Sequence, residues 1–175
     1  SDTLKKIGNA FESHGIVFTQ TGGIEPARPE LRTYVGQDGL RHFFDDVYEV
    51  IKDRGGEVVI TGFYEDIFTE TLGKEFHYMH MDRMSKLKNY TMRCLIEEGD
   101  RNFLASHYCE YRWSPRGEFR PVAFYIYADK IAFIQFDVPV DSPMVTIIKS
   151  KQITDAFRAQ FESMWRSSKE PKHGK

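Results

Sequence analysis

The apolar positions between residues 31 and 63 follow a strand pattern, then a helical pattern, then a strand pattern again. Residues 31–35 form a short β-type run that ends at Gly36. Residues 57–63 contain a continuous apolar run, which is typical of a central strand with helices above and below it. The segment between them carries apolar side chains three or four residues apart, as on one face of a helix: Leu40, Phe43, Phe44, Val47, Val50 and Ile51. We expect this helix to end at Gly55-Gly56, because glycine tolerates a positive φ.

The middle of the chain continues the alternation of helix and strand. Residues 66–88 keep a roughly helical spacing of apolar side chains and predict a long second helix, in which Gly73 weakens the middle and is a candidate break. Residues 91–96 predict a third strand, and residues 107–113 a fourth strand before the turn at Pro115. Alternating strands and helices indicate an α/β sheet with right-handed crossovers.

The last third of the chain has a different pattern. Residues 122–127 and 131–136 flank Ala128-Asp129-Lys130 and predict a tight hairpin, and residues 144–148 add a strand. The C-terminal helix has one apolar stripe, made by Ile153, Phe157, Phe161, Met164 and Trp165. The expected fold class is therefore α/β, with a mixed sheet flanked by helices.

The two ends of the chain differ from this folded unit. Leu4, Ile7 and Phe11 are spaced for a short amphipathic helix, and the following glycines and prolines are typical of a linker. We expect residues 1–29 to be a linker or helical appendage and residues 30–168 to be one folded domain. The polar residues 169–175 predict a disordered tail.

Charge and composition narrow the class of partner. The chain has 175 residues, a formal net charge of −2 and a pI near 6.3, which argues against a grip on a DNA backbone by this segment alone. No apolar run approaches the roughly 20 residues that cross a bilayer, so we expect no membrane contact and a cytoplasmic location. Cys94 and Cys109 lie far apart and predict two buried thiols rather than a disulfide or a zinc site.

One crevice in the predicted sheet is suited to a ligand. Gly62 ends the central strand and Phe63–Asp66 lead into a helix, and open α/β sheets bind ligands beyond the carboxyl ends of their strands. An equally good interpretation is that Gly62 serves only the turn, because the chain has no Gly-x-Gly-x-x-Gly and no Gly-Lys-Ser/Thr loop.

Side chains that carry chemistry are present, but in weak patterns. His77 and His80 lie three residues apart near Asp82 and are able to share a metal, yet no third ligand of the usual type is evident, and packing at a surface or an interface is the stronger interpretation. His107 is better explained as a strand histidine bonded to a neighbour than as a pocket residue. No serine lies in a nucleophile elbow, and neither cysteine has a histidine motif around it.

A run of basic residues lies near the end of the predicted second helix. It would suit an anionic partner, but a solvated face that complements the helix dipole is the better interpretation of these residues: Arg83, Lys86, Lys88 and Arg93.

Several segments together resemble a known family. These are residues 31–40 and 56–62, the strand Glu110–Pro115, and a closing series made of residues 126–134, 145–153 and Phe157–Trp165, which ends in Phe-x-x-x-Trp. In order and spacing they resemble the effector domain of TrmB-type transcriptional regulators, over roughly residues 30 to 167. The resemblance implies a phospholipase-D-like α/β fold that in some members binds sugars. It also implies a DNA-binding winged helix, so we expect DNA contact only through a separate N-terminal domain.

The resemblance also bears on catalysis. Phospholipase-D-type hydrolysis needs a histidine, a lysine two residues later and a downstream aspartate, and only His173-Gly174-Lys175 has the first spacing. We therefore expect a phospholipase-D-like half without a catalytic motif, with no enzymatic activity, no cofactor and no metal site. Because such enzymes join two halves, we expect two chains to pair as a homodimer.

The favoured hypothesis is a ligand-sensing or dimerisation domain of a transcriptional regulator, with a sugar-like effector. From their positions, the residues expected to bind it are Tyr34, Phe63, Tyr64, Arg112 and Trp113. Two alternatives stay open. One is a stand-alone partner-binding module, and the other is a metal-dependent hydrolase that uses His77, His80 and Asp82.

Overall fold

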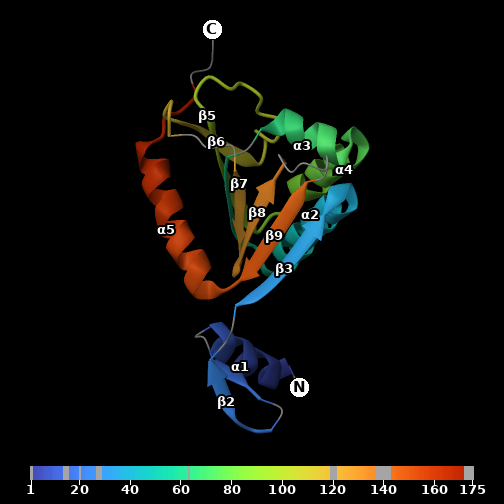
Figure 1. The fold of residues 1–175 in the computed structure, drawn as a ribbon, viewed down its shortest axis with the longest axis vertical. Helices are drawn as coiled ribbons and strands as arrows, with labels where there is room; N and C mark the ends of the chain where they lie inside the picture. The colour runs from blue at the N-terminus through green and yellow to red at the C-terminus, as the bar shows by residue number, and fades with distance from the viewer. Residues whose placement is uncertain are drawn as a thin grey trace.

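The computed structural model describes residues 2–13, 16–19, 21–26, 29–62, 64–118, 122–136 and 143–171. A seven-stranded sheet with the order β3-β9-β8-β7-β4-β5-β6 forms its centre (Figure 1). Its strands are β3 (Glu30–Val35), β4 (Gly56–Thr61), β5 (Tyr90–Glu97), β6 (Cys109–Ser114), β7 (Ala123–Tyr127), β8 (Lys130–Gln135) and β9 (Met144–Lys149). Strands β4, β5 and β6 run parallel, while the other neighbours are antiparallel, so the predicted mixed sheet is confirmed.

Helices cover both faces of this sheet (Figure 1). Helices α2 (Gly36–Arg54), α3 (Glu65–Leu72) and α4 (Lys74–Ser85) lie on one face, and α5 (Lys151–Ser167) lies on the other. The central strand β4 is buried on both sides, as its apolar run predicted. Val58 and Ile60 belong to the larger core under α2, and Val59 belongs to the smaller core under α5.

The predicted helix boundaries follow the glycines. Helix α2 ends at Gly55, whose φ is 65° and whose N–H donates to the carbonyl oxygen of Ile51. A Cβ at Gly55 would overlap the carbonyl oxygen of Asn89, so only glycine fits this position. The expected long second helix is broken at Gly73, which has a φ of 82° and separates α3 from α4.

Helix α5 is fixed to the sheet by apolar and charged contacts. Phe161 is fully buried, and Trp165 is nearly so. On the same face, Arg93 of β5 pairs with Glu57 of β4 at 2.6 Å and also with Glu162 of α5. Buried rings and an ion-pair network therefore hold α5 across the middle of the sheet, over β4, β6, β7 and β8.

The two ends depart from the sequence prediction. Residues 2–26 contain a helix, α1 (Asp2–Ser13), as expected, and also a small antiparallel pair, β1 (Ile16–Phe18) with β2 (Ile24–Pro26), where only a linker was predicted. At the other end, Lys169 pairs with Trp113 through two backbone hydrogen bonds, although a disordered tail was expected from this residue on. No helix among the described residues is long and apolar enough to cross a membrane.

Candidate ligand-binding pocket

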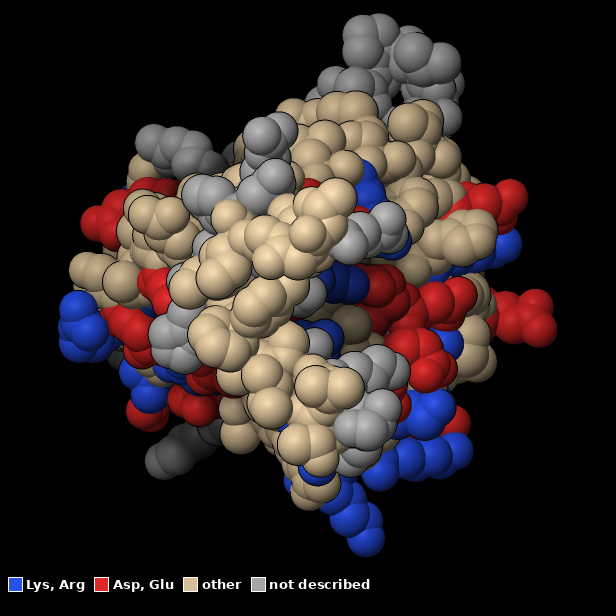
Figure 2. Space-filling view, turned by 90° about the horizontal axis from the view of Figure 1, so that it is seen from below, with Lys and Arg blue, Asp and Glu red and all other residues tan. Residues whose placement is uncertain are grey.

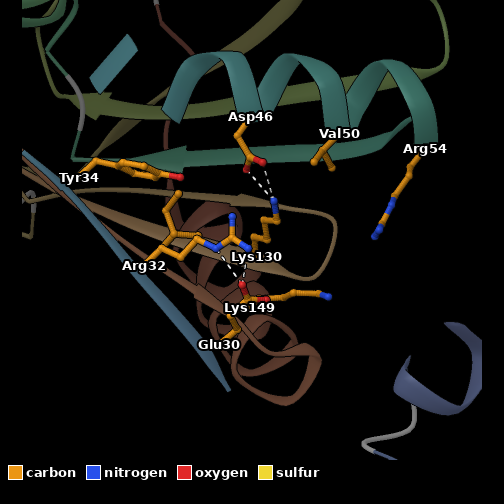
Figure 3. A pocket seen from close by; sticks show the side chains of 9 residues that line it. Glu30, Arg32, Tyr34, Asp46, Val50, Arg54, Lys130 and Lys149 are labelled. Carbon is orange, nitrogen blue, oxygen red and sulfur yellow. Dashed lines mark hydrogen bonds and ion pairs between the residues drawn. The ribbon is translucent and has the colours of Figure 1, made fainter. Parts of the chain in front are cut away.

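A hollow of about 160 Å³ lies between helix α2 and one edge of the sheet (Figure 3). Strands β3, β8 and β9 form its floor, and α2 forms one wall. Most of the side chains that line it are charged, and the full lining consists of Glu30, Arg32, Tyr34, Asp46, Val50, Arg54, Lys130, Ile147 and Lys149.

The periodicity of the elements brings these side chains together. Glu30, Arg32 and Tyr34 alternate along β3 and therefore share one face of the sheet. Across the sheet, Glu30 pairs with Lys149 of β9, which in turn pairs with Lys130 of β8. The α2 wall is made by residues 46, 50 and 54, which are spaced four apart and so lie on one side of the helix.

Asp46 and Lys130 form the ordered part of the pocket. The Nζ atom of Lys130 lies 2.7 Å from each carboxylate oxygen of Asp46, and the buried hydroxyl of Tyr127 donates to the same carboxylate at 2.7 Å. Only 19% of the Lys130 side chain and 31% of the Asp46 side chain are exposed. Burial, then the charge of Asp46, raises the pKa of Tyr127, so its hydroxyl stays a donor.

Most side chains at the rim of the pocket are more exposed than Asp46 and Lys130, and they differ in whether they form ion pairs. Arg32 pairs with Glu30, and this hydrogen bond lowers the pKa of the Glu30 carboxyl. Arg54 lies 3.3 Å from Asp129. Lys149 makes no ion pair with the described residues.

The sum of these charges is positive. Four cationic side chains and two carboxylates line the hollow, which gives it a net charge of +2 in a chain whose own net charge is −2. Figure 2 shows the molecule from below, where Lys and Arg atoms are interleaved with Asp and Glu atoms in and around a hollowed region. This face is therefore no broad basic surface of the kind that binds a DNA backbone.

The pocket offers three kinds of contact. Its cations attract an anionic group, Asp46 and Glu30 accept hydrogen bonds from hydroxyls, and the half-buried ring of Tyr34 presents an aromatic face. Its volume is below the roughly 300–1,000 Å³ of pockets that enclose drug-sized molecules, so the arrangement suits a small, hydroxylated, anionic compound.

The residues expected to bind a ligand do not all meet here. Tyr34 lines the pocket, but Tyr64 lies at the carboxyl end of β4, where its hydroxyl donates to Glu97 at 3.0 Å. Arg112 lies over the ring of Trp165, on the face that α5 covers. Trp113 is packed in the core on the opposite face, and its indole N–H donates to the carbonyl oxygen of Asp100. Phe63 lies outside the described residues.

Most of the pocket residues were missed by sequence reasoning. The alternation along β3 is a visible signal, because it places Glu30 and Arg32 on the same face as Tyr34. No comparable signal links Asp46 to Lys130, since these residues are far apart in the chain and meet only when α2 packs over β8.

A second, enclosed polar cluster lies beneath α3 and α4. Glu65 is 3% exposed and accepts a hydrogen bond from the hydroxyl of Tyr111. Thr69 donates to the carbonyl oxygen of Glu65 and therefore accepts from His77 Nδ1, which leaves His77 Nε2 3.9 Å from the Glu65 carboxyl. Burial raises the pKa of Glu65 to about 7 and lowers that of His77. Both groups are thus favoured in their neutral forms, in a cavity of about 30 Å³.

The structure also places the other polar residues singled out from the sequence. His77 and His80 are buried rather than at the surface, and Asp82 is exposed and bound to Lys86, so these three residues do not form a common site. Among the described residues, no group of three or more His, Cys, Asp or Glu side chains is placed to hold a metal ion. His107 is exposed in the turn before β6, not in a strand, and stacks edge-on with Tyr108.

The basic run and the cysteines have separate explanations. Arg83 pairs with Asp45 of α2 at 2.7 Å, whereas Arg93 binds glutamates on the α5 face, so the four basic residues do not form one patch. Cys94 and Cys109 are buried free thiols, as predicted. Burial raises the pKa of both, so neither is an activated nucleophile.

Comparisons with solved structures identify the fold. TrmBL2, an archaeal chromatin protein with a novel mode of DNA binding, matches with a TM-score of 0.50 and 11% identity over 81% of this chain and 55% of its own. Nuc of Salmonella typhimurium, a phospholipase D family member, matches with a TM-score of 0.55 and 12% sequence identity. The match covers 83% of this chain and 100% of the Nuc chain. NucT of Helicobacter pylori matches with a TM-score of 0.52 and 8% sequence identity. The match covers 82% of this chain and 100% of the NucT chain.

These likenesses show that the chain has a TrmB-like, phospholipase-D-like α/β fold, as the sequence resemblance implied. The chain spans a little over half the length of the TrmBL2 chain that it matches. No protein-family model matches the sequence, and neither does any curated protein.

Proposed function

We propose that this chain is the ligand-sensing domain of a transcriptional regulator and that the pocket between α2 and β3 binds its effector. The observation that carries the proposal is the preformed hollow itself, in which Asp46 and Lys130 are already paired and Tyr34 borders a positive rim. A fold shared with a DNA-binding chromatin protein supports the regulatory context. DNA contact is proposed to come from a separate winged-helix domain.

The lining indicates the chemistry of the effector. A neutral sugar would leave the excess positive charge of the pocket uncompensated, whereas a carboxylated sugar would reduce this charge and a phosphorylated sugar would bring it close to zero. We therefore propose a sugar-like ligand of monosaccharide size with one anionic group. The anionic group would meet Lys149 and Arg32, and the hydroxyls would meet Asp46.

Two further observations support binding rather than catalysis. The described lining of the pocket contains no histidine, serine or cysteine, and each of its two carboxylates is held in an ion pair, Asp46 with Lys130 and Glu30 with Arg32. The enclosed Glu65 cluster borders a cavity of about 30 Å³. This leaves room for about one water molecule and is too small for a substrate.

The position of the pocket suggests how binding would be transmitted. Glu30, Arg32 and Tyr34 lie on β3, the strand that directly follows the N-terminal unit of residues 2–26 (Figure 1). A ligand that holds Arg32 against the α2 wall would favour one arrangement of this strand over others. If the conformation of an attached domain depends on the arrangement of β3, ligand binding would then shift the conformational equilibrium of that domain.

Thermal unfolding with a panel of small ligands tests this function. Glucose 6-phosphate, gluconate, glucose and inorganic phosphate present the anionic group and the hydroxyls together or separately. We expect the two anionic sugars to raise the Tm in a concentration-dependent way, and each of the other two to raise it less. A panel in which glucose raises the Tm as much as its phosphate would contradict the proposed role of the positive rim.

A further inference from the structure

The two edges of the sheet differ in how they are protected. At the β6 edge, the backbone of Lys169 pairs with Trp113 through hydrogen bonds of 2.8 and 3.0 Å, so this edge is partly capped. The outer side of β3 has no strand partner among the described residues. An open, regular edge strand is a template for another strand, and proteins usually protect such edges with charges, prolines or bulges.

The side chains of β3 divide by face. The charged residues Glu30 and Arg32 point toward the pocket under α2. Leu31, Thr33 and Val35 point to the opposite face, where Leu31 pairs across the sheet with Ile148 of the core under α5. Helix α5 lies over β4, β6, β7 and β8 and leaves this margin open, so Leu31 and Val35 are each 64% exposed.

The hydrogen-bond phase of β3 decides which backbone groups face outward. The N–H of Gly36 donates to the carbonyl oxygen of Pro143, which continues the register in which Val35 pairs with Met144. Hydrogen-bonded and non-hydrogen-bonded pairs alternate in an antiparallel ladder, so residues 30, 32 and 34 bond to β9. The N–H and C=O groups of Leu31, Thr33 and Val35 therefore point to the open edge.

From this arrangement we infer that a second copy of this chain docks on β3, by antiparallel pairing of β3 with β3 about a two-fold axis through Thr33. In this register Thr33 faces Thr33 of the second copy, and Leu31 faces Val35 of the second copy on both sides of the axis. The backbone groups of all three outward-facing residues of each copy then form hydrogen bonds with the other copy, about six in all. Both exposed aliphatic side chains of each copy are covered.

The neighbouring registers are less complementary. An axis through residue 32 would place the two Arg32 side chains directly opposite each other, and like charges in that position are unfavourable. An axis through Thr33 instead places Arg32 opposite Tyr34 of the second copy, an arrangement that permits a cation–π contact. It would also bring Arg32 of the second copy to the rim of the ligand pocket.

This inference names the interface of the homodimer expected from the sequence, and it does not require the pocket to bind a ligand. Sedimentation equilibrium on the full chain tests it through a charge exchange. We expect Leu31→Glu and Val35→Lys each to weaken the dimer about tenfold, because each substitution disrupts two symmetry-related pairs. The double variant should recover most of the affinity, because the introduced carboxylate faces the introduced ammonium of the other copy.

Two further variants complete the test. Thr33→Pro removes an N–H that faces outward, so it should abolish the dimer while circular dichroism and urea unfolding show an intact fold. Val122→Lys changes another exposed aliphatic residue, 49% exposed, that directly precedes β7, a strand separated from β3 by β8 and β9, and it should leave the dimer unchanged.

A monomeric wild-type chain would overturn the pairing, and a dimer whose double variant is weaker than either single variant would overturn this register. A monomer whose Tm still rises with an anionic sugar would leave the sensing function standing, so the two proposals can fail separately.

Discussion

The Nζ atom of Lys130 in β8 lies 2.7 Å from each carboxylate oxygen of Asp46 in α2, and this ion pair joins the helix to the floor of the pocket. The same carboxylate accepts a hydrogen bond from Tyr127, a residue with no exposed surface. Asp46 therefore has two roles: it is an acceptor in the proposed binding site, and it satisfies two polar groups that folding removes from water.

The first prediction concerns the stability that this relationship supplies. Asp46→Ala leaves the Tyr127 hydroxyl and the Lys130 ammonium without their partner, and we expect a loss of about 2 kcal/mol in the free energy of unfolding. Urea denaturation measures it. Asp129→Ala removes the carboxylate of a more exposed pair with Arg54 and should cost less than about 0.5 kcal/mol. Equal losses in the two variants would contradict the role assigned to Asp46.

The second prediction concerns pH and the enclosed cluster. Burial raises the pKa of Glu65 to about 7 in the folded chain, from 4.5 in the unfolded chain. The folded state then holds a proton that the unfolded state has released, so this group lowers stability progressively from pH 4.5 to about 7. Glu65→Gln removes this loss and keeps an acceptor for Tyr111.

We therefore expect Glu65→Gln to gain stability relative to the wild type as pH rises through this range, by up to about 3 kcal/mol above it. Urea denaturation at several pH values gives the difference directly. Comparison with the wild type isolates this carboxyl from His77, whose lowered pKa acts in the opposite direction in both proteins. Glu70→Gln makes the same chemical change on the exposed side of α3 and serves as the control for the substitution itself. A flat difference for Glu65→Gln would contradict the assigned pKa.

The third prediction concerns the end of α2. Gly55→Ala introduces a Cβ that overlaps the backbone of Asn89 at a positive φ, and we expect it to cost about 2 kcal/mol or more. Gly56→Ala is the matched control, since its φ is also positive, at 102°, but its Cβ would meet no atom within 4 Å. The control should cost about 1 kcal/mol. Thermal unfolding of both variants checks this, and a smaller loss at Gly55 than at Gly56 would show that the close approach has no energetic role.

The fold was largely predictable because its determinants are local. The helical spacing in α2 and α5, the apolar run of β4 and the hairpin at Ala128-Asp129 are all visible in the sequence. The short strands β1 and β2 were missed because three-residue strands are too short to show a period.

The binding site was less predictable because pockets are made by long-range packing. Arg112 and Trp113 were both expected to bind the ligand, although neighbouring residues on a strand point to opposite faces of the sheet. The structure places them there, with Arg112 against Trp165 and Trp113 in the larger core on the opposite face. Tyr34 was named from its position at the end of a predicted strand, and it lines the pocket, whereas Asp46 appears in the sequence as one of several polar residues on α2.

The most direct test of the account is the affinity of the pocket for an anionic sugar, measured by isothermal titration calorimetry with glucose 6-phosphate. Lys149→Gln removes one positive charge from the rim and should weaken binding about tenfold with no loss of stability, because Lys149 has no ion-pair partner among the described residues. Arg166→Gln removes an exposed charge on α5 and should leave the affinity unchanged. If wild type, Lys149→Gln and Arg166→Gln bind the ligand equally well, or none binds it, the pocket is not the sensing site.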